Sequence, residues 1–257
     1  MNTSPPLDHL ADQPADCLGS TRLLDLDNSR LRLRAQSLTQ LAQTDVQKAV
    51  LVHDFVKSLP FGCIAGFDHV SASAVLKQGR GDCHTKGTLF VALLRSAGVP
   101  ARLRFVGLPA AFLWGIFDLG DSVITHAVGE VYLQGRWVQT DTYVMDSTLE
   151  GHAAMWLQQQ QRFLGYGIHL QAKRFWDGQH DAHGQYHSDY FDSLPLSDWG
   201  ASHDPEHFYD NKAHPELHMS WLTRAKWMVA AGLINRRTRQ LRDTPPATPP
   251  LQGLGRA

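Results

Sequence analysis

The sequence GDCHTKGTLFVALLRSAGVP, residues 81–100, predicts a buried helix around which the fold is organised. Asp82 is a favoured residue for the cap of a helix, because its carboxylate accepts hydrogen bonds from the free amides of the first turn. Residues 89–94 are apolar without interruption, which is typical of a helix that is covered on all sides. Gly98 is suited to the left-handed conformation that ends a helix, and Pro100 prevents its continuation.

Cys83 falls at the first position of this helix. Backbone amides without partners and the helix dipole stabilise negative charge there. A thiol in this place ionises at a lower pH than a free thiol and is a nucleophile near neutral pH. The Asp82 carboxylate opposes this ionisation, but as a cap it points toward the amides and not toward the sulfur. Cys17 and Cys63 lack such a setting, and we predict that both are unreactive.

The composition is that of a protein with a large core and little net charge. The chain has 257 residues, of which 43% are hydrophobic, and its 24 basic and 25 acidic residues give a net charge of -1. A nucleic acid or an anionic membrane requires a basic field, so we expect neither as a partner. Three cysteines do not suggest a disulfide framework, and the first residues lack the basic and apolar segments of a secretory signal. We therefore expect a cytoplasmic protein without a membrane segment.

The pattern along the chain predicts four parts. They are a flexible arm over residues 1–20, a catalytic core over 21–150, an extension over 151–243 that packs on the core, and a disordered tail over 244–257. Strands are predicted at 29–34, 101–106, 123–133 and 136–144, and helices at 44–59, 71–77, 155–163 and 219–233. The last helix would turn Trp221, Ala225, Met228, Val229 and Leu233 inward, and the basic run Arg236, Arg237, Arg239 and Arg242 would be a solvated face.

The strands at 123–133 and 136–144 predict the partners of Cys83. If Gln134 and Gly135 form a two-residue hairpin turn, the numbers of facing residues add up to 269 and Val128 lies opposite Asp141. Side chains alternate between the two faces of a strand, so His126 shares a face with Asp141. The two are then diagonal neighbours within reach of one another. A histidine that exchanges a proton with a thiol, and a third group that orients its ring, are what thiol catalysis requires.

Three blocks of the sequence resemble the transglutaminase-like superfamily. The run from Gly81 to Arg102 is similar to the nucleophile helix of that family, and HAVGEV at 126–131 and GRWVQTD at 135–141 are similar to its next two blocks. The resemblance covers about residues 45–145, and Cys83, His126 and Asp141 fall on the family's catalytic triad in the same order. It implies a papain-like α+β core in which the cysteine helix packs on an antiparallel sheet.

The resemblance also implies a reaction, acyl transfer through a thioester on Cys83. Water as the acceptor gives a peptidase or amidase and an amine gives a transglutaminase, with a peptide, an amide or another acyl compound as substrate and no cofactor. Two departures from the family pattern leave an inactive binding module as the alternative. Val128 stands where the family usually has an aromatic residue, and Thr142 follows Asp141 where proline is usual. The oligomeric state is left open.

A metal site is a third interpretation, which depends on the histidine-rich second half of the chain. His180, His183 and His187 are spaced like ligands on one helix face. However, Gly178 and Gly184 weaken a helix there, and paired cysteines are absent from this segment. We therefore predict a solvated, histidine-rich loop without a metal ion.

Overall fold

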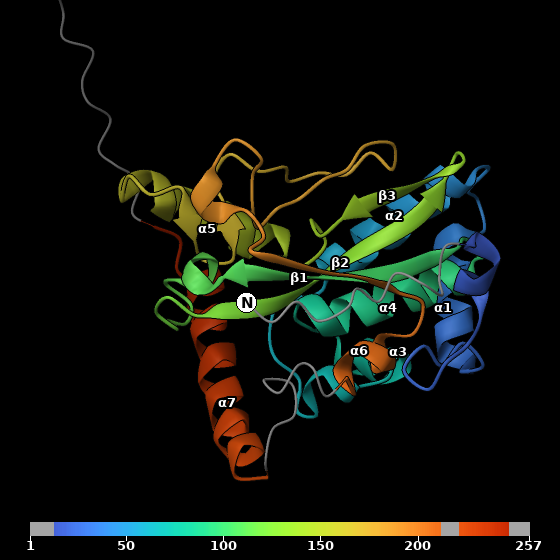
Figure 1. Ribbon diagram of the computed structural model, residues 1–257, viewed down its shortest axis with the longest axis horizontal. Coiled ribbons are helices and arrows are strands. Elements are labelled where there is room, and N and C mark those ends of the chain that lie inside the picture. The colour runs from blue at the N-terminus through green and yellow to red at the C-terminus, as the bar shows by residue number, and fades with distance from the viewer. Residues whose placement is uncertain (1–12, 212–220, 247–257) are drawn as a thin grey trace, which may run out of the picture.

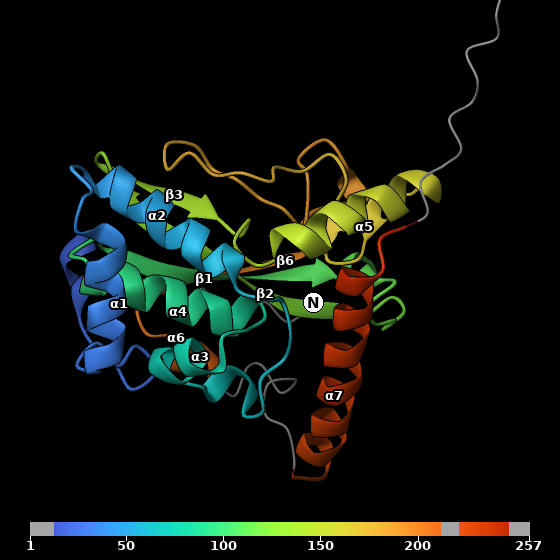
Figure 2. The same cartoon turned by 180° about the vertical axis from the view of Figure 1, so that it is seen from behind.

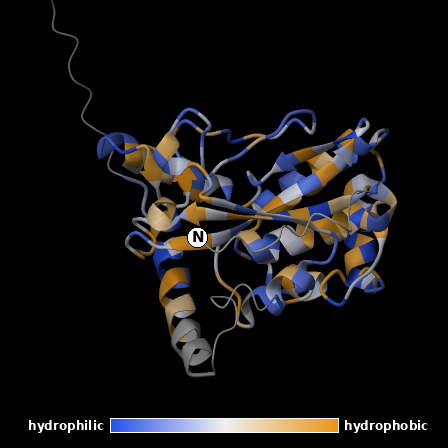
Figure 3. Ribbon diagram, in the orientation of Figure 1, coloured by the Kyte–Doolittle hydropathy of each residue, from blue (hydrophilic) through white to orange (hydrophobic). Residues whose placement is uncertain are grey.

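A four-stranded antiparallel sheet, in the order β3-β2-β1-β6, forms the centre of the molecule (Figure 1). The computed structural model describes residues 13–211 and 221–246, with the backbone alone for residues 67 and 221–228. The strands of the central sheet are β1 (Ala101–Pro109), β2 (Val123–Leu133), β3 (Arg136–Thr140) and β6 (Ser197–Ser202). Hydrophobic and polar residues alternate along β1 and β2, whereas the shorter β3 and β6 are more polar (Figure 3). The sheet therefore carries the core on the face that the helices cover.

Helix α4 (Cys83–Ser96) packs on strands β1 and β2 and is surrounded by three further helices (Figure 2). These are α1 (Ser29–Thr39), α2 (Asp45–Ser58) and α3 (Ala72–Gln78). Every residue from Leu89 to Leu94 is fully buried, as the apolar run predicts. The helix ends at Ser96, and Gly98, two residues later, has a φ of 80° in the left-handed region. The expected α+β arrangement, with the cysteine helix on an antiparallel sheet, is confirmed.

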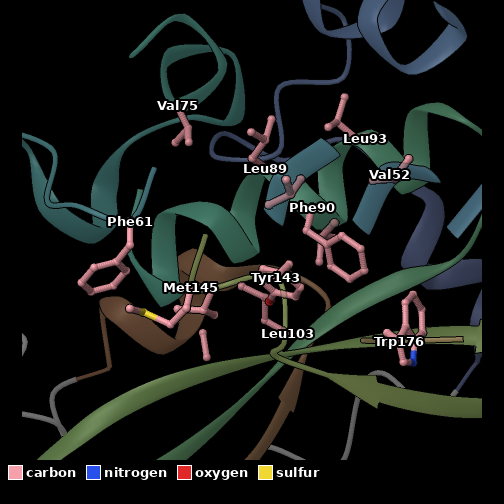
Figure 4. Packing of buried hydrophobic residues seen from close by; sticks show 14 of the residues in the cluster. Val52, Phe61, Val75, Leu89, Phe90, Leu93, Leu103, Tyr143, Met145 and Trp176 are labelled. Atoms are coloured by element: carbon pink, nitrogen blue, oxygen red, sulfur yellow. The ribbon is translucent and has the colours of Figure 1, made fainter. Parts of the chain in front are cut away.

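Close packing between α4 and the sheet fixes the loop that follows β3. The Phe90 ring stacks on the Tyr143 ring with 4.6 Å between centroids (Figure 4). At Gly129, on β2, an added Cβ would come within 2.7 Å of the Phe90 ring, so only glycine permits this approach. Tyr143 lies two residues beyond Asp141, and its packing therefore holds the end of this strand pair against the cysteine helix.

The hairpin between β2 and β3 has the predicted turn and register. Leu133 pairs with Arg136 and Gly129 pairs with Thr140, so the numbers of facing residues add up to 269. Gln134 and Gly135 both have positive φ, at 51° and 84°, as a tight two-residue hairpin turn requires.

The C-terminal half contributes one strand to the central sheet, a separate two-stranded sheet and three helices within the described residues. Strand β6 pairs with β1, so the central sheet combines strands from the predicted core over 21–150 and from the predicted extension over 151–243. The remaining elements are α5 (Ser147–Gln159), β4 (Leu164–Gly165), β5 (Ile168–His169), α6 (Pro205–Tyr209), α7 (Trp221–Asp243) and the 3-10 turns Pro14–Leu18, Phe67–His69, Ala110–Leu113 and Phe191–Ser193. Helix α7 lies at the end of the sheet away from α1 in both views (Figures 1 and 2). None of the helices in the described ranges has the length and hydrophobicity needed to cross a bilayer.

The strand predicted at 29–34 is wrong, because these residues begin α1. The side chain of Asn28 caps the helix by accepting hydrogen bonds from the amides of Arg30 and Leu31. Leu31 and Ala35, four residues apart, are both buried, whereas Leu33 is 64% exposed. The alternation of leucine and arginine at 30–34 resembles a strand, but the burial of Leu31 and Ala35 at a spacing of four residues is that of a helix.

Two predictions on the terminal segments also need correction. Residues 13–20 were expected in a flexible arm, but the turn Pro14–Leu18 buries Cys17, and the Gly19 carbonyl accepts a hydrogen bond from Arg95. On α7, Val229 and Leu233 are exposed, and the helix instead turns Ala231, Ile234 and Leu241 inward. The other inward positions predicted there, Trp221, Ala225 and Met228, lie outside the described side chains, as do residues 1–12 and 247–257.

Candidate active site

Cys83 is the first residue of α4, and its neighbour Asp82 caps the helix. The Asp82 carboxylate accepts hydrogen bonds from the Thr85 amide at 3.0 Å and the Thr85 hydroxyl at 2.8 Å. The Asp82 amide in turn donates to the Thr85 hydroxyl at 2.9 Å, which completes a reciprocal cap. The carboxylate is thus directed at the start of the helix, as expected, and Cys83 remains partly exposed.

His126 and Asp141 are in direct contact beneath the surface. His126 Nε2 lies 3.0 Å from Asp141 Oδ2, and both side chains have no exposed area. Because a carboxylate only accepts hydrogen bonds, this contact places a proton on Nε2. The second ring nitrogen, Nδ1, is buried and has no hydrogen-bond partner among the described residues. Nδ1 is therefore the nitrogen that remains for an exchange with the thiol of Cys83.

A segment far along the chain fixes the Asp141 carboxylate. Its Oδ1 accepts a hydrogen bond from the Gly184 amide at 2.6 Å, and the Asp141 amide donates to the Ala182 carbonyl. One oxygen of the carboxylate thus accepts a hydrogen bond from Gly184 and the other accepts one from His126. The orientation of the His126 ring consequently depends on residues 182–184 as well as on the hairpin.

The charges around Cys83 favour a thiolate. Burial alone would raise the pKa of the Cys83 thiol. The positive charges of His84 and His126 outweigh this effect and lower the pKa to about 6. Burial lowers the pKa of His126, yet the thiolate charge and the hydrogen bond to Asp141 outweigh this and raise it to about 9. Between these two values the pair consists of a thiolate and an imidazolium.

A second histidine and aspartate, His84 and Asp68, flank Cys83 on its helix side. His84 Nδ1 lies 3.2 Å from Asp68 Oδ1, and its Nε2 lies 3.2 Å from the Thr125 carbonyl oxygen. The ring stacks on Tyr209 with 5.4 Å between centroids. Burial lowers the pKa of His84, but the negative charges of Asp68 and Cys83 outweigh this and raise it well above its usual value. The sequence interpretation missed this pair, although the position of His84 next to Cys83 was a signal.

Buried cations hold the loop from Asp141 to Asp146. Lys57 Nζ donates to the Thr142 carbonyl at 2.8 Å, and Lys86 Nζ donates to the carbonyls of Tyr143 and Val144. Arg242 pairs with the Asp146 carboxylate at 2.7 Å and is mostly buried, so the prediction of a solvated face is wrong at this position. Burial lowers the pKa of Lys86 to about 7. The sequence interpretation overlooked Lys57 and Lys86, whose partners include backbone carbonyls that a sequence pattern does not reveal.

The two departures from the family pattern have local explanations. Thr142, in place of proline, forms a hydrogen bond between its hydroxyl and His53 Nε2 at 2.8 Å, which ties the loop to α2. Val128, in place of an aromatic residue, is buried in a small hydrophobic cluster that also contains Phe112. The Phe112 ring stands edge-on to the His126 ring with 6.0 Å between centroids. An aromatic neighbour of His126 is therefore present, supplied by the turn Ala110–Leu113.

A cavity of about 340 Å³ opens beside Cys83 and His126. Val128 is not one of its lining residues, whereas Phe112 is. The valine at position 128, where the family usually has an aromatic residue, therefore does not deprive the cavity of an aromatic wall.

The histidines considered as metal ligands are in different surroundings. His180 is an exposed partner of Asp177, His187 stacks on His169, and His183 lies 4.0 Å from Asp141 Oδ2. Across residues 13–211 and 221–246, no group of three or more potential ligands is arranged to hold a metal ion. These side chains thus provide no support for a metal centre in the described part of the chain.

Comparison with known proteins identifies the segment that carries this site. Residues 32–142 match the model of the transglutaminase-like superfamily. A candidate cysteine protease from Cytophaga hutchinsonii is 22% identical, with a TM-score of 0.41 over 53% of this chain and 44% of that one. A candidate protease from Parabacteroides distasonis is 16% identical, with a TM-score of 0.33 over 49% of this chain and 26% of that one.

The chain therefore spans less than half of either structure, and no curated protein matches it. The matched segment contains the cysteine helix, both strands of the hairpin and the residues Cys83, His126 and Asp141. The resemblance to the transglutaminase-like superfamily is thus confirmed as a family match over residues 32–142.

Proposed function

We propose that this protein is a cysteine-dependent enzyme of acyl transfer or amide hydrolysis, with Cys83 as nucleophile, His126 as proton carrier and Asp141 as the group that orients it. One observation carries the proposal. The thiol lies at the start of a helix, next to a histidine whose other nitrogen is 3.0 Å from a fully buried carboxylate. The charges of two histidines, which lower the pKa of the thiol to about 6, support the same role.

In the first half of the reaction the thiolate attacks a carbonyl carbon of the substrate. A C–S bond forms while the electron pair of the carbonyl moves onto its oxygen. The His126 imidazolium then donates its Nδ1 proton to the leaving group, the bond to that group breaks, and a thioester remains on Cys83. Asp141 keeps the ring in the orientation that this transfer needs through its bond to Nε2.

The start of α4 is suited to stabilise the negative oxygen of that intermediate. The first amides of a helix have no partner within the helix, and Cys83 supplies one of them. An amide aimed at the oxygen where charge develops lowers the barrier of acyl transfer. The same amides and the helix dipole also stabilise the thiolate before the attack.

The second half of the reaction requires an acceptor for the acyl group. Neutral His126 takes a proton from water or from an amine, which attacks the thioester carbon and releases the Cys83 thiolate. Water would make the protein a hydrolase and an amine would make it a transferase.

Selective alkylation tests the nucleophile. Iodoacetamide near neutral pH is expected to modify Cys83 in the natural protein and to modify nothing in Cys83→Ala. Burial raises the pKa of both Cys17 and Cys63, so neither is expected to react. Cys63→Ala is the matched control and should be labelled like the natural protein. Undiminished labelling of Cys83→Ala would contradict the proposal.

Intact-mass spectrometry with a panel of acyl donors tests the reaction. A mass increase equal to the acyl group, absent from Cys83→Ala, would identify a thioester. Loss of this mass in buffer would indicate hydrolysis, and faster loss on addition of a primary amine would indicate transfer. A thiol that is alkylated but never acylated would instead support the alternative of an inactive binding module.

A further inference from the structure

We propose that the cavity beside Cys83 binds the acyl group of the substrate and that this acyl group is apolar, an alkyl chain or an aromatic ring. The inference deepens the proposed function and rests on it. The cavity has a volume of about 340 Å³ and reaches both Cys83 and His126. A substrate whose carbonyl carbon meets the sulfur therefore has its acyl group at the mouth of this space.

Apolar side chains from several separate elements make up most of the cavity wall. The turn Ala110–Leu113 supplies Phe112 and Leu113, and the following loop supplies Ile116. Phe61 and Met145 lie next to one another on the side of the packed core (Figure 4). Water in contact with such walls is displaced favourably by an apolar group, in proportion to the area that it covers.

The charged groups at the cavity are already paired with protein groups. Asp68 lies 3.2 Å from His84, Asp82 accepts two hydrogen bonds from Thr85, and His126 is bonded to Asp141. A charged acyl group would need a free partner of opposite charge to compensate for its loss of water. Among the described lining residues, the unpaired Nδ1 of His126 already has the Cys83 thiolate as its charge partner, so the pocket favours an uncharged acyl group.

Helix α7 closes one side of the cavity and is firmly attached there. Ile234 faces the cavity, and the neighbouring Asn235 makes two hydrogen bonds with the backbone of Cys63, at 2.8 and 2.9 Å. Arg237 donates to the Gly115 carbonyl at 3.0 Å. These bonds tie α7 to two segments that line or border the cavity. The pocket is therefore built largely before a substrate arrives, as small-molecule sites usually are.

The size of the cavity sets an upper limit on the acyl group. Small-molecule pockets typically hold about 300–1,000 Å³, and this cavity is at the lower end of that range. We expect the reaction rate to rise with acyl length while the added carbons enter the cavity, and to level off or fall once it is full. Each buried methylene should raise kcat/KM about fourfold.

A series of 4-nitrophenyl esters tests this inference directly. The Cys83 thiolate forms a C–S bond with the ester carbon, the C–O bond breaks, and 4-nitrophenolate leaves with the electron pair and is measured by its absorbance. We expect kcat/KM to increase from acetate through butyrate and hexanoate and to reach a maximum before dodecanoate. A succinate half-ester of similar size carries a carboxylate and is expected to react more slowly than butyrate.

Substitutions of Leu113 alter the volume of the cavity in both directions. Leu113→Trp fills space and should move the preference toward acetate, while Leu113→Ala should move it toward longer chains. Leu41→Trp is the matched control, because Leu41 is 82% exposed in the turn after α1, and it should leave the profile unchanged. If Leu113→Trp fails to fold, the shift in Leu113→Ala still tests the assignment.

The outcomes separate this inference from the proposed function. If Cys83 is alkylated but no ester acylates it, the proposed function is contradicted. If esters acylate Cys83 at rates independent of chain length, or if the charged ester is preferred, the apolar pocket alone is contradicted. A maximum that moves with the residue at position 113 supports both.

Discussion

Cys83 lies between two pairs of histidine and aspartate that differ in how their rings are held. The sheet-side pair consists of His126, on β2, and Asp141, just after β3. The helix-side pair consists of His84, on α4, and Asp68, in the turn Phe67–His69. Both histidines contribute positive charge that lowers the pKa of the thiol.

The difference lies in the ring nitrogens. His126 has one nitrogen bonded to Asp141, whereas its Nδ1 has no hydrogen-bond partner among the described residues. His84 Nδ1 likewise makes no aligned hydrogen bond within the described part of the chain, but it lies 3.2 Å from the Asp68 carboxylate, and Nε2 lies 3.2 Å from the Thr125 carbonyl oxygen, so each nitrogen faces an oxygen that can only accept. Two such neighbours favour a proton on both nitrogens. The comparison therefore suggests a division of roles, with His126 able to exchange a proton and His84 acting as a fixed positive charge.

Replacement of His126 should produce the largest effect. His126→Ala removes the proposed proton carrier, and we expect kcat/KM with a 4-nitrophenyl ester to fall by about 10²–10⁴-fold. The rate of Cys83 alkylation near neutral pH should fall much less, because His84 still stabilises the thiolate. His180→Ala, which removes an exposed histidine paired with Asp177, is the control and should match the natural protein. An equally large fall of both rates would contradict the division of roles.

Asp141→Asn tests the orienting group and should have the next largest effect. The hydrogen bond that His126 donates to Asp141 helps to raise the pKa of His126, so its weakening should lower this pKa below about 9. The alkaline side of the pH profile of kcat/KM is then expected to move toward lower pH, with a rate loss of about 10²-fold. Asp177→Asn, at the exposed pair, is the control. An unchanged alkaline limb would mean that Asp141 does not act through His126.

The sheet-side pair could be predicted from the sequence because its geometry is local. The hairpin turn at Gln134 and Gly135 fixes the register, and the alternation of side chains then brings His126 and Asp141 to one face. The cysteine helix was equally predictable, since its cap and its apolar run are adjacent in sequence. Such features depend on residues separated by a few positions or by one tight turn.

The helix-side pair depends on tertiary packing that a single sequence does not contain. Asp68 reaches His84 from a short 3-10 turn, and Tyr209, which covers the His84 ring, comes from α6 more than a hundred residues later. The Gly184 amide that holds Asp141 is similarly remote. The misread strand at 29–34 has a different cause, because a leucine–arginine alternation fits both a strand and an exposed helix until the capping role of Asn28 is included.

His84→Gln tests the role of the helix-side pair. The positive charge of His84 is one of the two that lower the pKa of Cys83, so its removal should raise this pKa from about 6 by about one unit. The midpoint of the pH dependence of alkylation is expected to shift upward by that amount. Well above this midpoint kcat/KM should fall by less than tenfold, because His126 still carries the proton. His180→Gln is the control. An unshifted midpoint would mean that the charge of His84 does not lower the pKa of Cys83.

Asp68→Asn should have the smallest effect, and one that depends on pH. The negative charge of Asp68 raises the pKa of His84, so the variant should lower that pKa toward the ordinary histidine value of about 6.5. The groups facing His84 are Asp68, Cys83 and the hydroxyl-bearing ring of Tyr209, with Asp82 and His126 nearby. Below the new pKa, His84 keeps its charge and the alkylation rate should match the natural protein. Above it, His84 becomes neutral and the rate should approach that of His84→Gln. A deficit that is the same at every pH would mean that Asp68 acts by holding the local structure and not by holding the proton on His84.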